Sequence, residues 1–223
     1  KKAKKPRPSP SDSRRARCSM LVLGNESHTA KFRKALTRIP HAAAPDVPRQ
    51  ERHAKNPRQY PHTVALPKSV SLPIAYLGTA AAGAIAFPVD PKAGPRVWED
   101  ILKRFAPAAV VTSREATLPL ADASLPIVAA EDAFDQEARA AAIDDAVPAD
   151  TIFYLNMTSG LTGRPQAAAA THGNIVANTR AAVNALALTP DDVHLVTFAA
   201  HAHPHECFAR ALILGGTAVF LES

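Results

Sequence analysis

The chain of 223 residues is long enough for one or two domains, and its 47% hydrophobic residues suffice to build a core. Its two cysteines, Cys18 and Cys207, lie far apart and match neither a disulfide framework nor a zinc site. No apolar run reaches the length of about 18 residues that a membrane span needs, and no signal peptide follows the charged N-terminus. The composition therefore predicts a protein of the reducing cytoplasm, without a transmembrane segment.

Charge divides the chain into two unequal parts. Residues 1–60 hold 16 Lys and Arg against 4 Asp and Glu, a balance of +12, whereas residues 61–223 carry −6. The basic part has little apolar periodicity apart from Met20 to Leu23, so it cannot bury enough surface to offset its ordering entropy. We therefore predict a basic Pro- and Arg-rich segment over 1–63, disordered or unrelated to the rest, followed by an α/β domain over 64–223.

Two interpretations of the basic segment stay open. Clusters such as Arg14, Arg15 and Arg17 are suited to contact nucleic acid or an anionic membrane. The absence of interleaved aromatic residues favours the second interpretation, a solvated basic tail.

Segments typical of helices and strands alternate after the basic part. The first half of this region is predicted to form a helix at 72–82, a strand at 84–89, a helix at 95–105, strands at 108–112 and 126–130, and a helix at 134–142. The second half is predicted to form a strand at 151–157, a helix at 171–186, a strand at 193–198, a helix near 205–214 and a strand at 217–221. This alternation predicts a mainly parallel sheet with helices on both faces, whose ligand lies beyond the carboxyl ends of the strands.

A glycine-rich loop follows the predicted strand at 151–157. Glycines let the backbone approach a ligand, hydroxyl groups donate hydrogen bonds, and the helix expected after Thr171 adds partial positive charge. The spacing is neither that of a Walker P-loop nor that of a dinucleotide fold. The sequence therefore predicts a phosphate site of a different kind, formed by Thr158, Ser159, Gly160, Thr162, Gly163 and Gln166.

This loop resembles the signature loop of the adenylate-forming (AMP-binding) enzymes, whose pattern is [ST]-S-G-[ST]-T-G-x-P-K-G. The chain departs from that pattern at Leu161, at Gln166, which replaces the lysine, and at Ala167. The resemblance continues in T-H-G-N at 171–174 and in the stretch from Ile74 to Pro91, which is similar to A-x-L-G-x-x-x-A-G-x-x-x-x-P-x-[DN]-P. The positions of the signature loop that match are Thr158, Ser159, Gly160, Thr162, Gly163 and Pro165.

The resemblance implies an acyl-CoA synthetase, which uses ATP and Mg²⁺ to activate a carboxylic acid. The acid would become an acyl-adenylate, and coenzyme A or a carrier thiol would then take the acyl group. Gln166 carries no charge, so part of the phosphate neutralisation that the family's lysine supplies is missing here.

A second candidate site follows the predicted strand at 193–198. In the family this position carries an aromatic and histidine element that lines the acyl pocket, which implies pocket roles for His201 and His203. The same stretch holds His205, Glu206 and Cys207, so a metal site and a simple polar surface are alternatives. Pro204 is expected to begin a helix, which disfavours the metal site. No catalytic residue and no metal ligand is assigned.

The resemblance also implies that the chain is incomplete. Family members carry a Y-G-x-T-E-like segment, a ribose-binding Asp and a lysine on a small C-terminal domain, and the chain has no counterpart of these. We therefore expect a partial large domain that is inactive alone, with the missing parts supplied by a separate polypeptide. The alternative is a non-catalytic phosphate-binding or scaffold remnant, in which the basic segment makes the important contacts.

Overall fold

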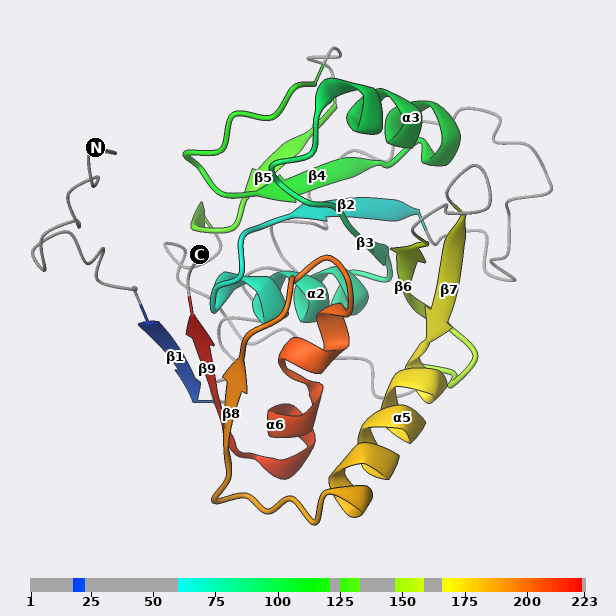
Figure 1. The fold of residues 1–223 in the computed structure, drawn as a ribbon. Coiled ribbons are helices and arrows are strands. Elements are labelled where there is room, and N and C mark those ends of the chain that lie inside the picture. The colour runs from blue at the N-terminus through cyan, green and yellow to red at the C-terminus, as the bar shows by residue number, and fades with distance from the viewer. Residues whose placement is uncertain (1–17, 23–59, 121–124, 133–146, 159–165, 222–223) are drawn as a thin grey trace, which may run out of the picture.

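A computed structural model describes residues 18–22, 60–120, 125–132, 147–158 and 166–221. The strands in these residues form two sheets, one of six strands in the order β5-β4-β2-β3-β6-β7 and one of three strands in the order β1-β9-β8. Figure 1 shows β2, β4 and β5 of the larger sheet above α2, β6 and β7 to its right, and the smaller sheet at its lower left. The sequence predicts one sheet. Two form, because β8 pairs with β9 and with no strand of the larger sheet.

The larger sheet is parallel except at one edge. Its parallel strands are β2 (Pro61–Ala65), β3 (Ile85–Pro88), β4 (Ala109–Thr112), β5 (Ile127–Ala129) and β6 (Ile152–Met157). The strand β7 (Ala167–Thr171) runs antiparallel to β6. In the smaller sheet, β8 (Val193–Val196) and β9 (Thr217–Leu221) are parallel, and β1 (Cys18–Val22) is antiparallel to β9. The prediction of a mainly parallel α/β sheet is therefore confirmed.

Helices cover both faces of the larger sheet, as the sequence predicts (Figure 1). The helix α3 (Pro95–Phe105) lies on one face, and α2 (Ser71–Ala81) lies on the other. Neighbouring residues of one strand point to opposite faces, so Val64 packs in the α2 core and Ala65 in the α3 core. Among the described residues, no helix is long and apolar enough to cross a membrane.

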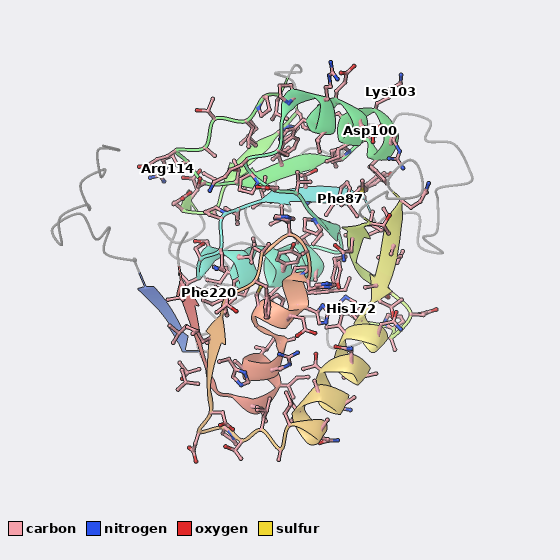
Figure 2. The ribbon with its side chains drawn as sticks, in the orientation of Figure 1. Phe87, Asp100, Lys103, Arg114, His172 and Phe220 are labelled. Atoms are coloured by element: carbon pink, nitrogen blue, oxygen red, sulfur yellow. The ribbon has the colours of Figure 1, made fainter. Side chains whose placement is uncertain are left out.

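Each of the two cores contains large, fully buried side chains. Trp98 and Ile101 of α3 fill the α3 core together with Phe87 of β3. The α2 core joins the two sheets, because it also contains Phe208 and Phe220 from the three-stranded side. Figure 2 labels Phe87 of the α3 core in the region of the larger sheet and Phe220 of the α2 core beside the smaller sheet.

The C-terminal half of the described chain contributes three further helical segments. They are α5 (His172–Ala185), the 3₁₀ helix η3 (Pro204–Cys207) and α6 (Ala209–Leu214). The predicted boundaries of α3 and β9 are those observed, and Pro204 begins a helical turn as expected. The predicted helix at 134–142 lies outside the described residues.

Three strands of the structure are missing from the sequence prediction. β1 lies within the basic part, and β2 begins directly after it. The charged residues and prolines there conceal short apolar runs. β7 consists of four alanines and a threonine, a composition that favours a helix. Pairing with β6 decides the conformation of β7 instead. The hydrogen bonds between the two strands satisfy the backbone groups of β7, and this outweighs the local helix propensity of alanine. The division at residue 63 stays a prediction, since most of residues 1–59 lies outside the described part.

Candidate functional site

The two ends of the glycine-rich loop are joined by hydrogen bonds. The Thr158 N–H donates to the Gln166 carbonyl oxygen at 2.8 Å, and the Gln166 N–H donates to Thr158 Oγ1 at 3.1 Å. The loop therefore connects β6 to β7 as a hairpin connection, at the carboxyl end of β6. Ser159, Gly160, Thr162 and Gly163, the other four predicted phosphate-binding residues, lie outside the described residues.

The helix expected beside the loop begins at the opposite end of the strand pair. Thr171, which precedes α5, pairs with Ile152 at the start of β6, whereas the loop follows Met157. The five residues of β7 separate the helix from the loop by about 17 Å at the usual rise of a strand. The prediction that this helix N-terminus adds positive charge to the phosphate site is therefore wrong, because β7 was missing from it.

Residues at the start of α5 have a local structural role. Thr171 and Asn174 form a capping box, in which each side chain accepts a hydrogen bond from the other residue's backbone N–H at 3.1 Å. His172 packs edge-on against the ring of Phe153 at 5.0 Å between centroids, and Figure 2 shows it at the junction with β7. The T-H-G-N segment therefore fixes the helix against β6.

The second candidate site lies on the segment 197–205, which we call the strap. It follows β8 and reaches toward the six-stranded sheet (Figure 1). His201 and His203, the predicted pocket residues, are both exposed on the strap. This segment does not open on the same sheet edge as the glycine-rich loop, since β8 belongs to the smaller sheet.

Side chains of the larger sheet nevertheless hold the strap close to β6. Asn156 Nδ2 donates to the Ala202 carbonyl oxygen at 2.8 Å, and Lys68 Nζ donates to the Thr197 carbonyl oxygen at 3.2 Å. Asn156 lies two residues before Thr158, where the glycine-rich loop begins. The two predicted sites are therefore neighbours through tertiary contacts rather than through a shared sheet edge.

His205 is the histidine of the strap that the structure buries. Its Nδ1 lies 2.9 Å from the Tyr154 hydroxyl, and its Nε2 lies 3.2 Å from Asn178 Oδ1 on α5. Its ring also stacks on Tyr154 with 5.9 Å between centroids. Burial lowers the pKa of His205, and the nearby Glu206 carboxylate opposes that shift. Sequence reasoning placed this residue only among alternative metal ligands, because nothing local marks which of three histidines is buried.

The metal alternative finds no support in the described residues. No three His, Cys, Asp or Glu side chains of this part of the chain are grouped so that they could hold a metal ion. Cys207 is buried, and this burial raises the pKa of its thiol to about 11. The thiol is therefore protonated at neutral pH and is a poor nucleophile in this environment.

An open pocket of about 320 Å³ lies at the carboxyl ends of other strands of the larger sheet. Lys68, Ser113 and Glu131 line it, and they follow the carboxyl ends of β2, β4 and β5. Its described lining includes no residue of β6 and neither Thr158 nor Gln166. Its place at the carboxyl ends of parallel strands matches the usual position of ligands in such sheets.

The burial of His205 and the partial burial of His172 predict a loss of stability in mild acid. Burial lowers the pKa of both His172 and His205 below 6.5, so the unfolded chain binds protons at a higher pH than the folded chain does. The free energy of unfolding should therefore be highest above 6.5 and fall as the pH drops toward the lowered pKa values. Urea unfolding at about pH 7.5 and about pH 5.5 measures this slope. The pH dependence of the free energy of unfolding should be smaller in His205→Gln and should persist in His201→Gln, a variant at an exposed site. Equal pH dependence in the native protein and both variants would contradict the role given to His205.

The fold defines an α/β domain with a mainly parallel sheet and a glycine-rich loop at the end of β6. The AMP-binding enzyme family matches residues 61–223, and the chain belongs to this family. The chain is 29% identical over 163 residues to an uncharacterized acyl--CoA ligase, YhfT, of Bacillus subtilis (strain 168), which covers 71% of the chain and 34% of that relative.

Solved structures have the same fold. ATP-bound MatB from Rhodopseudomonas palustris superposes with a TM-score of 0.67 at 20% identity, covering 86% of the chain and 37% of MatB. The O-succinylbenzoate coenzyme A synthetase MenE of Bacillus subtilis, in complex with AMP, gives a TM-score of 0.69 at 15% identity, with 86% of the chain and 47% of MenE covered. The chain therefore spans between about a third and half of the length of these proteins.

Proposed function

We propose that this chain contributes the phosphate-binding part of an enzyme that activates a carboxylic acid with ATP and passes the acyl group to coenzyme A or a carrier thiol. The observation that carries the proposal is the glycine-rich loop closed by Thr158 and Gln166 at the carboxyl end of β6. Membership of the AMP-binding family and the likeness to an acyl--CoA ligase support it.

The proposed chemistry is a nucleotidyl transfer followed by an acyl transfer. A carboxylate oxygen attacks the α-phosphorus of ATP, the bond to the β-phosphate oxygen breaks, and pyrophosphate leaves with its electron pair. The thiolate then attacks the acyl carbon and AMP leaves. Such transfers depend mainly on positioning and on neutralising phosphate charge.

The loop residues are proposed to bind and orient the β- and γ-phosphates through hydroxyl and backbone N–H donors. Thr158 is held at the loop entrance by its pair with Gln166, and the Gln166 side chain supplies an uncharged amide donor in place of an ammonium group. Ser159, Gly160, Thr162 and Gly163 complete the proposed set. His201 and His203 are proposed to line the acid side of the site, because the strap that carries them is bonded to Asn156.

Mg²⁺ fits this proposal as an ion carried by the nucleotide. The described residues hold no group of three acidic or histidine side chains that could bind a metal ion by themselves. Phosphate oxygens are the usual main ligands of Mg²⁺ in such sites, and the ion would neutralise phosphate charge there. No protein ligand is therefore assigned to it.

Further protein is proposed to be needed for turnover. The chain covers 34% of the acyl--CoA ligase relative and 37% of MatB, so most of an adenylate-forming enzyme has no counterpart in the matched region. We propose that the missing groups come from additional sequence or from a separate polypeptide. Pyrophosphate release by this chain with ATP, Mg²⁺ and a panel of fatty and aromatic acids should accordingly stay at background.

The binding step is tested by restoring the missing positive charge. Gln166→Lys should strengthen the binding of inorganic triphosphate and of ATP by about 1 kcal/mol, or about fivefold, because an ammonium group then reaches the phosphates. Isothermal titration calorimetry of both forms measures the change. The gain should not require the helix α5, which begins at the far end of β7.

Two further variants serve as controls for this titration. Thr117→Lys adds the same charge at an exposed position of the segment that follows β4, outside the predicted phosphate-binding residues, and should leave the affinity unchanged. Gly160→Val should abolish binding, because a branched side chain blocks the close approach of the backbone to the phosphates. If neither Gln166→Lys nor Gly160→Val alters triphosphate binding, the loop is an ordinary turn and the proposed function is wrong.

A further inference from the structure

The strap, residues 197–205, is bonded to the six-stranded sheet at three places along its length. Lys68, after β2, binds the Thr197 carbonyl oxygen at its start, and Asn156 of β6 binds the Ala202 carbonyl oxygen in its middle. The Tyr154 hydroxyl meets His205 at its end. All three bonds join residues far apart in sequence, so they act on the placement of the strap rather than on its local fold.

The face of β6 that meets the strap is polar at alternate positions. Tyr154 and Asn156 point toward the strap, as their bonds show, whereas Leu155 and Met157 pack against the α3 core on the other face. Among the described residues, the Tyr154 hydroxyl and Asn156 Nδ2 have hydrogen-bond partners only in the strap. Two successive positions of one strand face are therefore used to hold a segment of the other sheet.

The contacts of His205 favour one tautomer. Asn178 Oδ1 and the Glu206 carboxylate both face Nε2, which favours a proton on Nε2, and the neutral ring then presents a lone pair at Nδ1. The Tyr154 hydroxyl therefore donates to Nδ1 at 2.9 Å. Glu206 Oε1 is 3.7 Å from Nε2, and the Glu206 carboxylate is itself paired with Arg210. His205 thus links β6, the strap and α5 through one buried ring.

We propose that Tyr154 and His205 are positioning residues, which hold the strap in the conformation that presents His201 and His203 beside the end of β6. The proposal rests on the proposed function, in which the strap forms the acid side of the site. It assigns to His205 a role that differs from that of the two exposed histidines: His205 touches no substrate and acts through the strap.

The chain offers a matched pair of variants for testing this proposal. Tyr154→Phe removes the hydroxyl that donates to His205, whereas Tyr76→Phe removes a buried hydroxyl that has no hydrogen-bond partner among the described residues. The two tyrosines are neighbours, with 6.5 Å between their ring centroids. Both substitutions thus delete the same atom from the same core, and only one of them releases the strap.

The first measurement needs no ligand. In ¹⁵N spectra of the histidine rings, His205 should show the Nε2–H tautomer in the native chain and in Tyr76→Phe, and its Nδ1 signal should move to that of an unbonded nitrogen in Tyr154→Phe. Amide exchange at Ala202 and Glu206 should become about tenfold faster in Tyr154→Phe, while Val110 in β4 stays protected. Equal acceleration at all three amides would indicate general destabilisation and overturn the proposal.

The second measurement separates the strap from the phosphate loop. An acyl-sulfamoyl adenosine, which mimics an acyl-adenylate, and inorganic triphosphate are titrated into each form. Tyr154→Phe should weaken the binding of the mimic several-fold and leave triphosphate unchanged, whereas Tyr76→Phe should alter neither affinity. Unchanged mimic binding in Tyr154→Phe would overturn the positioning role. If the native chain binds neither compound, the proposed function fails, and the spectra and exchange rates still decide whether Tyr154 and His205 hold the strap.

Discussion

Replacing Trp98 by alanine is expected to lower the free energy of unfolding by about 3–5 kcal/mol, the usual cost of removing a large aromatic side chain from a core. Trp98 is fully buried between α3 and the larger sheet, where it packs in one cluster with Phe87 and Ile101. Leu155 and Met157 of β6 pack against the same cluster, so the truncation also loosens the strand that leads into the glycine-rich loop. Urea unfolding monitored by circular dichroism measures the loss.

The control for this experiment is Trp98→Phe. The indole Nε1 is buried and has no hydrogen-bond partner among the described residues, so deleting it sacrifices no such contact. The remaining ring still fills most of the space, and the expected cost is about 1–2 kcal/mol. A cost for Trp98→Ala no larger than that for Trp98→Phe would show that α3 does not depend on this side chain.

Introducing valine at Gly173 is the second change with a large expected effect. A Cβ atom at this position would lie 2.9 Å from the Ala149 carbonyl oxygen and 3.2 Å from the Ala149 Cβ. The oxygen belongs to the backbone, and the Cβ is attached directly to it. Neither atom can therefore move aside as the end of a flexible side chain does. The Gly173 N–H also donates to that carbonyl oxygen at 2.8 Å, which keeps the two segments close. We expect Gly173→Val to cost roughly 2–3 kcal/mol in the free energy of unfolding.

Ala177→Val provides the matched control in the same helix. Ala177 is exposed in the middle of α5, so valine there reports only the weaker helix propensity of a β-branched residue, about 0.5 kcal/mol. Comparing the two thermal midpoints separates the close approach at Gly173 from the propensity of valine. Similar midpoints in the two variants would contradict the steric argument.

The periodic elements were accessible to sequence reasoning. The apolar spacing from Trp98 onward predicts α3, and the confirmed family assignment follows from the glycine-rich loop and the stretch from Ile74 to Pro91. These signals are local, because helix and strand periods are written in consecutive residues. The phosphate-binding assignment of the loop stays a prediction, since residues 159–165 lie outside the described part of the chain.

The pairing of the strands was not accessible in the same way. Nothing in four consecutive alanines announces an edge strand, and nothing in β8 states that it pairs with β9 instead of continuing the larger sheet. The mistaken position of the α5 N-terminus follows directly from the missing β7. A strand is stabilised by its partner's backbone groups, and the identity of that partner is a property of the whole fold.

The sequence by itself determined the family, the α/β class, the loop at the end of β6 and most helix and strand positions, because hydrophobic period and glycine placement act within short segments. Only the tertiary structure decided that there are two sheets, that the strap is bonded to β6, and that His205 is the buried one of the three histidines at alternate positions of the strap. A buried polar ring requires partners at both nitrogens, and Tyr154 and Asn178 supply them from elements distant in sequence. These two hydrogen bonds form only once the chain has folded.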